Sequence, residues 1–256
     1  MHVVFASCGN DSIALIQYAY EKGLFDVTII YSDTGWAADW WEKRVKRVEE
    51  WARNLGFTFI RTKSIGMEAL VRKKNAWPRQ GIQFCTTELK IEPSKKMLDE
   101  IDPGKNAICL IGVRRVESQA RKFFPEYVES HPNQGGRRQW APLVDYTDVM
   151  RNDLIIRAGF DVLPHRSMEC FPCINSNRKD LLLLDKDEKR IDYIEQLEKE
   201  LGVTSNGKPR TMFRPYKYMG ATGIREIVRW ARSRRGKFDP DDGTGGGNCD
   251  GGFCDL

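Results

Sequence analysis

Residues 2–22 read HVVFASCGNDSIALIQYAYEK, and this stretch alone predicts a strand, a tight loop and a helix in succession. Residues 2–6 form a short apolar run that is typical of a buried strand. Small or polar residues occupy positions 7–12, and apolar side chains then recur at helical spacing from about Asp11 to Lys22. Gly23 is typical of the residue that follows the end of a helix.

The alternation of strands and helices continues along the chain. We expect further strands at 26–31, 57–62 and 107–112, and a long amphipathic helix over roughly 38–55. Strands joined by helical crossovers pack as a parallel sheet with helices on both faces. The sequence therefore predicts an α/β fold with a doubly wound parallel sheet.

A second, smaller part of the fold is expected towards the C-terminus. Helices are predicted at about 66–73, from Cys85 to about Glu100, at 147–158, from about Asn177, and at roughly 187–201 and 221–234, whereas 133–138 is predicted as a loop. The stretch 239–252 is rich in Gly and Asp and has little capacity to form a core. We expect a main domain over 1–160 and a small helical C-terminal lobe over 161–256 that carries most of the cysteines.

The composition limits the classes of function. The chain has 256 residues with 41 basic and 36 acidic side chains, and its net charge of +5 suits an anionic ligand and permits, without requiring, a nucleic-acid partner. It has no apolar run of about 18 residues, and its first residues lack the charged region and the small-residue cleavage site of a secretory signal. We therefore expect no membrane span and a cytoplasmic location, where cysteines are more often reduced, catalytic or metal-bound than paired in disulfides.

The loop at 7–12 has the features of a phosphate site. It lies between a buried strand and a helix N-terminus, where backbone N–H groups and the positive end of the helix dipole attract anions. The hydroxyls of Ser7 and Ser12 can donate to phosphate oxygens, and Gly9 permits close approach of the backbone. Asp11 would repel phosphate on its own, but it can hold a Mg²⁺ that bridges pyrophosphate oxygens. The competing interpretation is an ordinary helix N-cap.

Five segments in register resemble those of a known family. The loop SCGNDS resembles the SGGxDS signature of the PP-loop ATP pyrophosphatases, with Cys8 in place of a glycine. Four further segments resemble those of the PAPS reductase-like branch of the adenine nucleotide α-hydrolase superfamily: DTG at 33–35, the C…K…P helix start at 85–93, GxRxxES at 112–118, and the W-x-PL-x-D-W-T…DV segment at 140–149. The resemblance implies a Rossmann-like PP-loop nucleotide-binding domain over 1–160 that binds ATP, PAPS or APS.

The matching positions suggest roles for individual side chains. Arg114 follows a strand and Gly112, so its guanidinium can bind a phosphate, and Glu117 can orient it or cap the next turn. Lys90 lies near a helix start, where an anionic partner would offset its unfavourable interaction with the helix dipole. We expect catalytic roles for Asp11, Lys90 and Arg114. The residues expected to bind the nucleotide are Ser7, Gly9, Asp11, Ser12, Asp33, Thr34, Gly112, Arg114, Glu117 and Ser118.

Ordinary structural roles compete with these assignments. Without the motifs, Arg114 and Lys90 read as solvated surface side chains. Asp33 can receive a ribose hydroxyl or a metal, but the segment 33–35 also reads as a plain turn.

The cysteines form two pairs. Cys170 and Cys173 make a CxxC loop, which suits zinc, an iron–sulfur cluster or a redox pair, and Cys249 and Cys254 lie in CDGGFC near the C-terminus. Four thiolates complete a tetrahedral site. The resemblance implies a [4Fe–4S] cluster, with zinc as the alternative, and Cys85 at the helix start is an alternative ligand. The competing interpretation is a structural CxxC and a flexible tail.

Three functions follow from the resemblance. In the first, which Asp11 favours, ATP and Mg²⁺ adenylate an acceptor in sulfur transfer and pyrophosphate leaves, as in the ATP pyrophosphatases of DNA phosphorothioation and the tRNA thiolation enzymes. In the second, PAPS or APS is reduced to sulfite, although the ECGxH segment of those reductases has no counterpart. The third is a nucleotide sensor or partner subunit without turnover. Expected partners are an adenine nucleotide, a DNA or tRNA acceptor, a cysteine desulfurase or thiol reductant, and a second copy in a homodimer.

Overall fold

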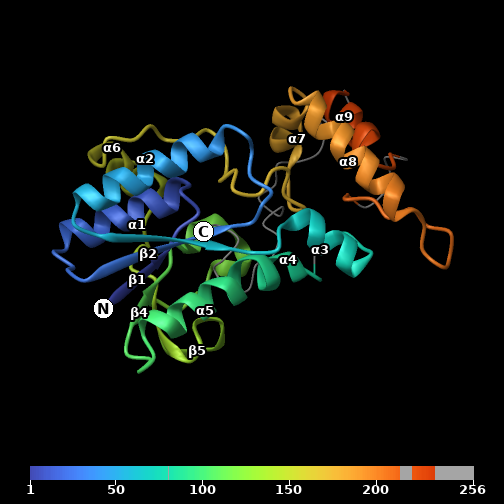
Figure 1. Ribbon diagram of the computed structural model, residues 1–256. Coiled ribbons are helices and arrows are strands. Elements are labelled where there is room, and N and C mark those ends of the chain that lie inside the picture. Colours follow the sequence, from blue (N-terminus) through green and yellow to red (C-terminus); the bar gives the residue numbers. More distant parts are fainter. Residues whose placement is uncertain (80, 214–220, 234–256) are drawn as a thin grey trace. The chain divides into compact units, whose positions relative to one another are not determined.

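The computed structural model describes residues 1–79, 81–213 and 221–233, and these residues form two compact units (Figure 1). The described part of the first unit contains 1–66 and 85–170, and that of the second contains 67–84 and 171–233 with the gaps already given. The first unit continues past residue 160 to Cys170, and the second includes a segment from the N-terminal half of the chain. A domain boundary near residue 160 stays a prediction.

A six-stranded sheet in the order β3-β2-β1-β4-β6-β5 forms the centre of the first unit. Its strands are β1 (His2–Phe5), β2 (Val27–Asp33), β3 (Thr58–Lys63), β4 (Ile108–Leu110), β5 (Tyr127–His131) and β6 (Arg137–Trp140). All neighbouring pairs are parallel except β5 and β6, which are antiparallel. The predicted parallel sheet is confirmed, with the four predicted strands at β1, β2, β3 and β4, while β6 adds a fifth parallel strand and β5 an antiparallel edge.

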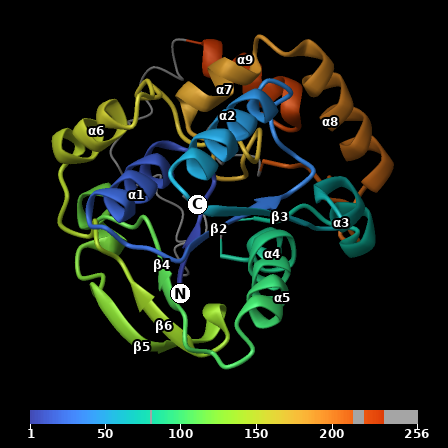
Figure 2. The same ribbon diagram turned by 60° about the vertical axis from the view of Figure 1, so that its left-hand side comes forward.

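Helices cover both faces of this sheet, as predicted. Figures 1 and 2 show α1 (Asn10–Glu21), α2 (Trp41–Asn54) and α6 (Asp148–Arg157) on one face and α5 (Glu92–Ile101) on the other. A short helix α4 (Phe84–Thr86) and a π-helical turn η1 (Thr87–Ile91) lead directly into α5. The fold is therefore doubly wound.

The short strand β1 is stable because it is apolar on both faces. Val3 and Phe5 pack in a cluster with Leu98 of α5 and Ile111, which follows β4, and the intervening Val4 is also fully buried. Successive side chains of a strand point to opposite faces, so β1 contributes to the core on both sides. Each such buried side chain contributes about 1.5–3 kcal/mol relative to exposure.

The strand order places a switch point beside β1. β1 pairs with β2 on one side and with β4 on the other, with His2 opposite both Val27 and Ile108. The chain first builds β2 and β3 on one side and returns to build β4 and β6 on the other. Ligands of open α/β sheets bind outside the carboxyl ends of the strands at such a point. The loops after β1 and β4 are therefore the first place to look for a site.

Helices dominate the second unit. It contains α3 (Met67–Lys74), α7 (Arg178–Leu184), α8 (Glu188–Leu201) and α9 (Ile224–Arg232), and α9 packs against both α7 and α8. The carboxylate of Glu198 accepts the backbone N–H groups of Met212 at 2.8 Å and Ile224 at 3.0 Å, which satisfies a donor at the start of α9. The helices predicted in this region are confirmed. No helix in the described ranges is long and apolar enough to cross a membrane.

One local prediction was wrong. We expected a loop over 133–138, but the 3-10 turn η4 (Pro132–Gln134) leads through two glycines into β6, which begins at Arg137. The Arg137 side chain is completely buried and pairs with Asp102 at 2.7 Å and Asp99 at 2.8 Å. The polar residues of this strand resemble a loop in sequence because their burial depends on carboxylates distant along the chain.

Candidate functional site

The loop at residues 7–12 folds back on itself at the start of α1, whose N-cap is Gly9. The backbone N–H of Ser7 donates to Ser12 Oγ at 2.9 Å, and the two hydroxyl oxygens lie 3.2 Å apart. The N–H of Gly9 donates to Ser7 Oγ at 3.3 Å. This compact turn gathers two buried hydroxyls at the first turn of a helix, the end that attracts anions. We call residues 7–12 the phosphate loop.

Cys8 keeps the loop in a backbone conformation that suits glycine. Its φ of 62° lies in the left-handed region, which costs a residue with a side chain about 1 kcal/mol. Arg44 Nε of α2 donates to the Cys8 carbonyl oxygen at 2.8 Å and supports this conformation. The thiol is fully buried, and burial together with the nearby charge of Glu169 raises its pKa. The substitution of the signature glycine therefore leaves the turn intact with an unreactive thiol inside it.

The loop after β4 meets the phosphate loop at the switch point. A Cβ atom on Gly112 would lie 3.2 Å from Asp11 Cβ and 3.3 Å from the Asp11 carbonyl oxygen, closer than most real contacts. A glycine at 112 therefore permits the first turn of α1 to approach the end of β4. Two residues further on, Arg114 is buried beside the same turn.

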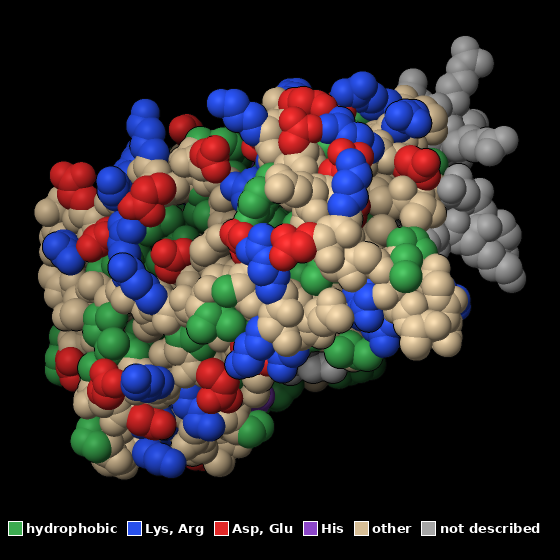
Figure 3. Space-filling model, turned by 45° about the vertical axis from the view of Figure 1, so that its right-hand side comes forward, with side chains coloured by type: hydrophobic (Ala, Val, Ile, Leu, Met, Phe, Trp, Pro, Cys, Tyr) green, Lys and Arg blue, Asp and Glu red, His purple; other side chains and the backbone are tan. Residues whose placement is uncertain are grey.

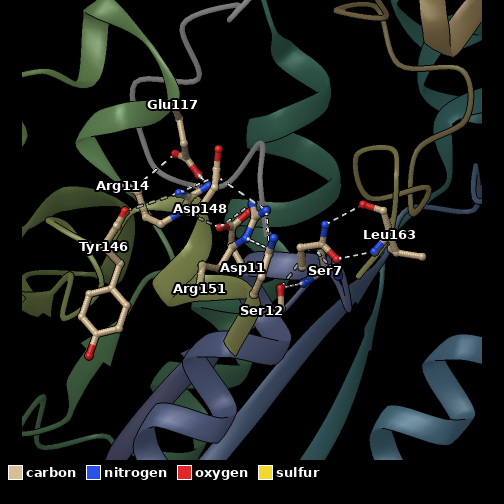
Figure 4. A network of polar contacts seen from close by, with 12 residues as sticks. Ser7, Asp11, Ser12, Arg114, Glu117, Tyr146, Asp148, Arg151 and Leu163 are labelled. Atoms are coloured by element: carbon tan, nitrogen blue, oxygen red, sulfur yellow. Dashed lines mark hydrogen bonds and ion pairs between the residues drawn. The ribbon is translucent and has the colours of Figure 1, made fainter. Parts of the chain in front are cut away.

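Arg114 binds three carboxylates around the phosphate loop (Figure 4). Its Nε donates to Asp11 Oδ1 at 2.8 Å and its Nη1 to Asp148 Oδ1 at 3.0 Å. Its Nη2 lies 3.5 Å from Glu117 Oε1, and Glu117 Oε2 also accepts the Arg114 backbone N–H at 3.2 Å. The two expected roles of Glu117, orienting the arginine and capping a turn, are both present in this geometry.

The charges of this network hold the guanidinium in its ionised form. Burial lowers the pKa of Arg114, but Asp11, Glu117 and Asp148 more than offset that effect, and the pKa is raised. Glu117 also pairs with Arg121. A cation therefore lies at the phosphate loop, and the carboxylates compensate its charge.

Arg151 joins the network although the sequence analysis did not single it out. Its Nη1 lies 3.6 Å from Asp11 Oδ1, and its Nη2 lies 3.6 Å from Asp148 Oδ1. The available signal was its position three residues after Asp148 on a predicted helix, which places both on one face. Ser118, predicted as a nucleotide ligand, is half-buried after the short 3-10 turn η2 (Arg115–Glu117).

The predicted residues after β2 serve the fold of the first unit. Asp33 Oδ1 accepts the backbone N–H of Gly35 at 2.9 Å and forms a turn. The Thr34 hydroxyl is buried, donates to the carbonyl oxygen of Glu169 at 2.6 Å and accepts the N–H of Trp36 at 3.2 Å. Thr34 therefore anchors a distant segment of the chain.

Lys90 is buried on the π-helical turn rather than solvated. Its ammonium forms an ion pair with Glu169, and the two side chains are 10% and 4% exposed. π-Turns are frequent at functional sites. Glu169 is the second important residue that sequence reasoning missed, because nothing near it in the chain indicates a lysine 79 positions away.

The cysteines are only partly described. Cys8 and Cys109 are buried, and Cys85, Cys170 and Cys173 are half-buried. Cys249 and Cys254 lie outside the described residues. Among the residues described, no group of three or more His, Cys, Asp or Glu side chains gathers as a metal site.

The donor set at Asp11 fits Mg²⁺ better than it fits a metal held by protein alone. Mg²⁺ commonly binds one or two carboxylates together with substrate phosphates and water. Asp11 can supply such a carboxylate, but its Oδ1 atom already contacts Arg114 and Arg151. An arriving polyphosphate offers these arginines other oxygens. The site can thus exchange internal ion pairs for contacts to an anionic ligand.

The chain was compared with protein-family models, with solved structures and with curated proteins. A family model described as "Phosphoadenosine phosphosulfate reductase domain" matches residues 1–174. Among solved structures, phosphoadenylyl-sulfate (PAPS) reductase from Candida auris, in a phosphate complex, is similar with 16% identity and a TM-score of 0.46, covering 63% of this chain and 75% of that one. A comparison with the curated proteins found no match.

Proposed function

The chain belongs to the phosphoadenosine phosphosulfate reductase domain family, within the PP-loop superfamily, and from this premise we propose a specific activity. It binds ATP or a related adenine nucleotide at the phosphate loop and acts in sulfur transfer by adenylating an acceptor. The acceptor attacks the α-phosphorus, the bond from that phosphorus to the bridging oxygen breaks, and pyrophosphate leaves with the bonding electrons.

The observation that supports this proposal most is the place of Asp11 in the first turn of α1, next to Ser7 and Ser12 and paired with Arg114 at 2.8 Å. A carboxylate at a phosphate site can bind a divalent cation that accompanies the phosphates. A leaving pyrophosphate is commonly accompanied by such a cation, which both the carboxylate and the phosphate oxygens bind. Mg²⁺ would supply charge neutralisation at the pyrophosphate oxygens.

The protein's own residues then have distinct tasks. The hydroxyls of Ser7 and Ser12 and the free N–H groups of α1 bind phosphate oxygens. Arg114 stabilises the charge that develops on the phosphates, as forked guanidinium groups do. Lys90 binds a further anionic oxygen. Asp33, Thr34, Gly112, Glu117 and Ser118 shape the nucleotide site around them.

The second candidate is the reduction of PAPS or APS to sulfite. The description of the matching family favours it. This candidate makes no use of a carboxylate in the phosphate loop, since neither substrate releases pyrophosphate. We therefore place it after the adenylating reaction.

The cysteines enter as proposed ligands of a [4Fe–4S] cluster, with zinc as the alternative metal. The set is Cys170, Cys173, Cys249 and Cys254, with Cys85 as an alternative member. Iron, sulfide and zinc analysis of protein purified without oxygen tests it. About four irons and four sulfides that are lost in Cys170→Ser support the cluster, whereas protein without any metal contradicts the ligand set.

Partners and location remain proposals of the same kind. We propose that the enzyme is cytoplasmic and that its acceptor is DNA or tRNA. We also propose a cysteine desulfurase or a thiol reductant as its protein or thiol partner, and a homodimeric state. Figure 3 shows basic and acidic side chains interspersed on one face of the molecule. The charges on that face therefore do not distinguish DNA or tRNA from other acceptors.

The test compares the two substrates directly. The full chain is incubated with ATP and Mg²⁺, with water as the default acceptor, and AMP and pyrophosphate are measured. A parallel reaction with PAPS and a thiol reductant measures sulfite. We expect AMP and pyrophosphate in equal amounts, and a loss of roughly 100-fold in Asp11→Asn.

The matched control is Asp26→Asn, since Asp26 is an exposed carboxylate that pairs only with the chain's N-terminal amine at 3.2 Å among the contacts described. This variant should retain full activity. Sulfite from PAPS without AMP from ATP would select the second candidate. Binding of ATP with neither product would leave a nucleotide-binding protein without turnover.

A further inference from the structure

Residues 163–170 cross the carboxyl ends of β1 and β2 in the first unit, and we call this segment the strap. At its start, Asn10 Nδ2 donates to the Leu163 carbonyl oxygen, and the Leu163 N–H donates to Asn10 Oδ1, both at 2.9 Å. In its middle, the Ser167 hydroxyl donates to the carbonyl oxygen of Ser7 at 3.2 Å. The strap is therefore attached to the phosphate loop at two places.

The other end of the strap is attached to the loop after β2. The N–H of Ala38 donates to the Met168 carbonyl oxygen at 3.0 Å, and the Thr34 hydroxyl donates to the Glu169 carbonyl oxygen at 2.6 Å. Thr34, which the family resemblance places beside the nucleotide, thus fixes the backbone of Glu169. The strap connects the two loops that the motifs assign to nucleotide binding.

Gly9 permits this attachment. A Cβ atom at position 9 would lie 3.0 Å from Ser167 Cβ, which is at the limit that real structures tolerate. The phosphate loop therefore needs a glycine here for the strap, independently of any need to approach a phosphate. The strap is packed against the loop itself and not merely tethered near it.

The Glu169 side chain of the strap forms a buried ion pair. Its side chain is 4% exposed, the Lys90 side chain is 10% exposed, and the two are in direct contact. An isolated charge this deeply buried is strongly unfavourable, so the direct contact stabilises both charged groups. The carboxylate also acts on the Cys8 thiol, whose pKa it helps to raise, so the pair lies within electrostatic reach of the phosphate loop.

We propose that Glu169 is a positioning residue of the nucleotide site, which holds the Lys90 ammonium beside the phosphate loop for an anionic oxygen of the nucleotide. This inference rests on the proposed function. An ammonium has three N–H donors, so Lys90 can retain Glu169 while it binds the nucleotide. The strap fixes Glu169 through its backbone, so the lysine is presented in one place before the nucleotide arrives.

A purely structural role of the ion pair makes a different prediction. If the pair only stabilises the strap, replacing both charges together by neutral side chains of similar size should restore stability and nucleotide binding alike. If Lys90 serves the nucleotide, the same double change should restore stability alone. Thermal stability and nucleotide affinity must therefore be measured on the same variants.

The experiment uses the full chain with Glu169→Gln, Lys90→Met, the double variant and Glu169→Asp. Thermal unfolding and the dissociation constants of ATP with Mg²⁺ and of PAPS are measured. We expect Glu169→Gln to weaken nucleotide binding roughly tenfold, which corresponds to the loss of one charge-assisted hydrogen bond. The same variant should have a lower melting temperature. The double variant should regain most of the melting temperature while binding stays weak. Glu169→Asp should retain part of the affinity.

A matched control is Lys199 on α8, which is 72% exposed and pairs with Glu195 at 3.0 Å. Lys199→Met should change neither quantity, because Glu195 keeps its ion pair with Arg225 at 3.2 Å. Wild-type affinity in the double Lys90 and Glu169 variant, or in a folded Glu169→Gln variant, would overturn the inference while the proposed function stands. If the wild-type chain binds neither nucleotide, both the proposed function and the inference about Glu169 fail.

Discussion

Two buried cations, Arg114 and Lys90, are predicted to serve the nucleotide, and their surroundings differ. On the β4 side, Arg114 contacts three carboxylates, one of which, Asp148, is 71% exposed. On the β2 side, the Lys90 ion pair with Glu169 is buried on both partners. We call these the Arg114 flank and the Lys90 flank.

The difference suggests how each flank responds to an anion. Arg114 can release one carboxylate to a phosphate and still keep others, and an exposed carboxylate is easily rehydrated. Separating Glu169 from Lys90 would break a direct contact between two buried charges, which is strongly unfavourable in the interior. The Arg114 flank is therefore suited to rearrange around a ligand, and the Lys90 flank to remain fixed.

The largest effect is expected from removing Arg114. Arg114→Met removes the buried guanidinium that pairs with Asp11 and Glu117, and it should destabilise the first unit by about 3 kcal/mol. It should also lower turnover of ATP by roughly 100-fold or more, because a phosphate-binding cation is lost. Chemical denaturation and AMP formation measure the two effects.

The neighbouring arginine provides the control for that change. Arg115 is 34% exposed and pairs at 2.5 Å with Asp145, which is 69% exposed. Arg115→Met should cost less than about 1 kcal/mol and leave turnover unchanged, because exposed ion pairs contribute little. Equal effects of the two variants would remove the distinction between a functional and a surface arginine here.

Asp11→Asn sharpens the comparison by separating stability from turnover. Arg114 retains Glu117 and Asp148 in this variant, so the free energy of unfolding should fall by only about 1 kcal/mol. Turnover of ATP should fall far more than stability. A loss of stability as large as that of Arg114→Met would show that the Arg114 flank is as rigid as the Lys90 flank.

Cys8 lies in the phosphate loop, and substitutions at this position test the backbone conformation of the loop. Because φ is 62° at this position, glycine should be tolerated better than alanine. We expect Cys8→Gly to be more stable than Cys8→Ala by about 1 kcal/mol, the reverse of their order in a helix. Greater stability of the alanine variant in thermal unfolding would argue against the left-handed turn.

The smallest effects concern thiol reactivity. Burial raises the pKa of Cys8, and it raises the pKa of Cys109 to about 12, so both thiols stay protonated at neutral pH. Only the thiolate reacts with iodoacetamide, so Cys8 and Cys109 should be alkylated last and half-buried Cys85 earlier. Mass spectrometry of the native protein over time gives the order, and early labelling of Cys8 would contradict a closed loop.

The same shifts predict how stability depends on pH. The unfolded chain loses its cysteine protons near pH 8.5, whereas the folded chain keeps those of Cys8 and Cys109. The contribution of these two protonated thiols to the free energy of unfolding is therefore fully present below about pH 8.5, and it is lost as the pH rises above that value. Denaturant titrations at several pH values should show a weaker decline in Cys8→Ala than in the wild type.

The fold was largely predictable from the sequence because its signals are local. The apolar run of β1, the periodic helix after it and the glycine at 23 occupy adjacent positions, and the structure has β1 and α1 there. The strand β6 was missed because the burial of Arg137 depends on Asp102, which is 35 positions away.

The candidate site was predictable in part for the same reason. Ser7, Gly9, Asp11 and Ser12 lie together in one loop, and the motif at 112–118 brings Arg114 to it. Arg151 and Glu169 carry no motif, and their relevance appears only when the fold places them beside Asp11 and Lys90. Sequence patterns identified the groups that we propose as ligand-binding residues, but not Arg151 and Glu169, which contact those groups.

The most direct test is a crystal structure of the full chain with Mg²⁺ and a non-hydrolysable ATP analogue. We predict that the phosphates lie at the N-terminus of α1, with Ser7, Ser12 and Arg114 in contact with them and Lys90 still paired with Glu169. An analogue bound elsewhere, with the phosphate loop empty and Arg114 still on Asp11, would contradict the account.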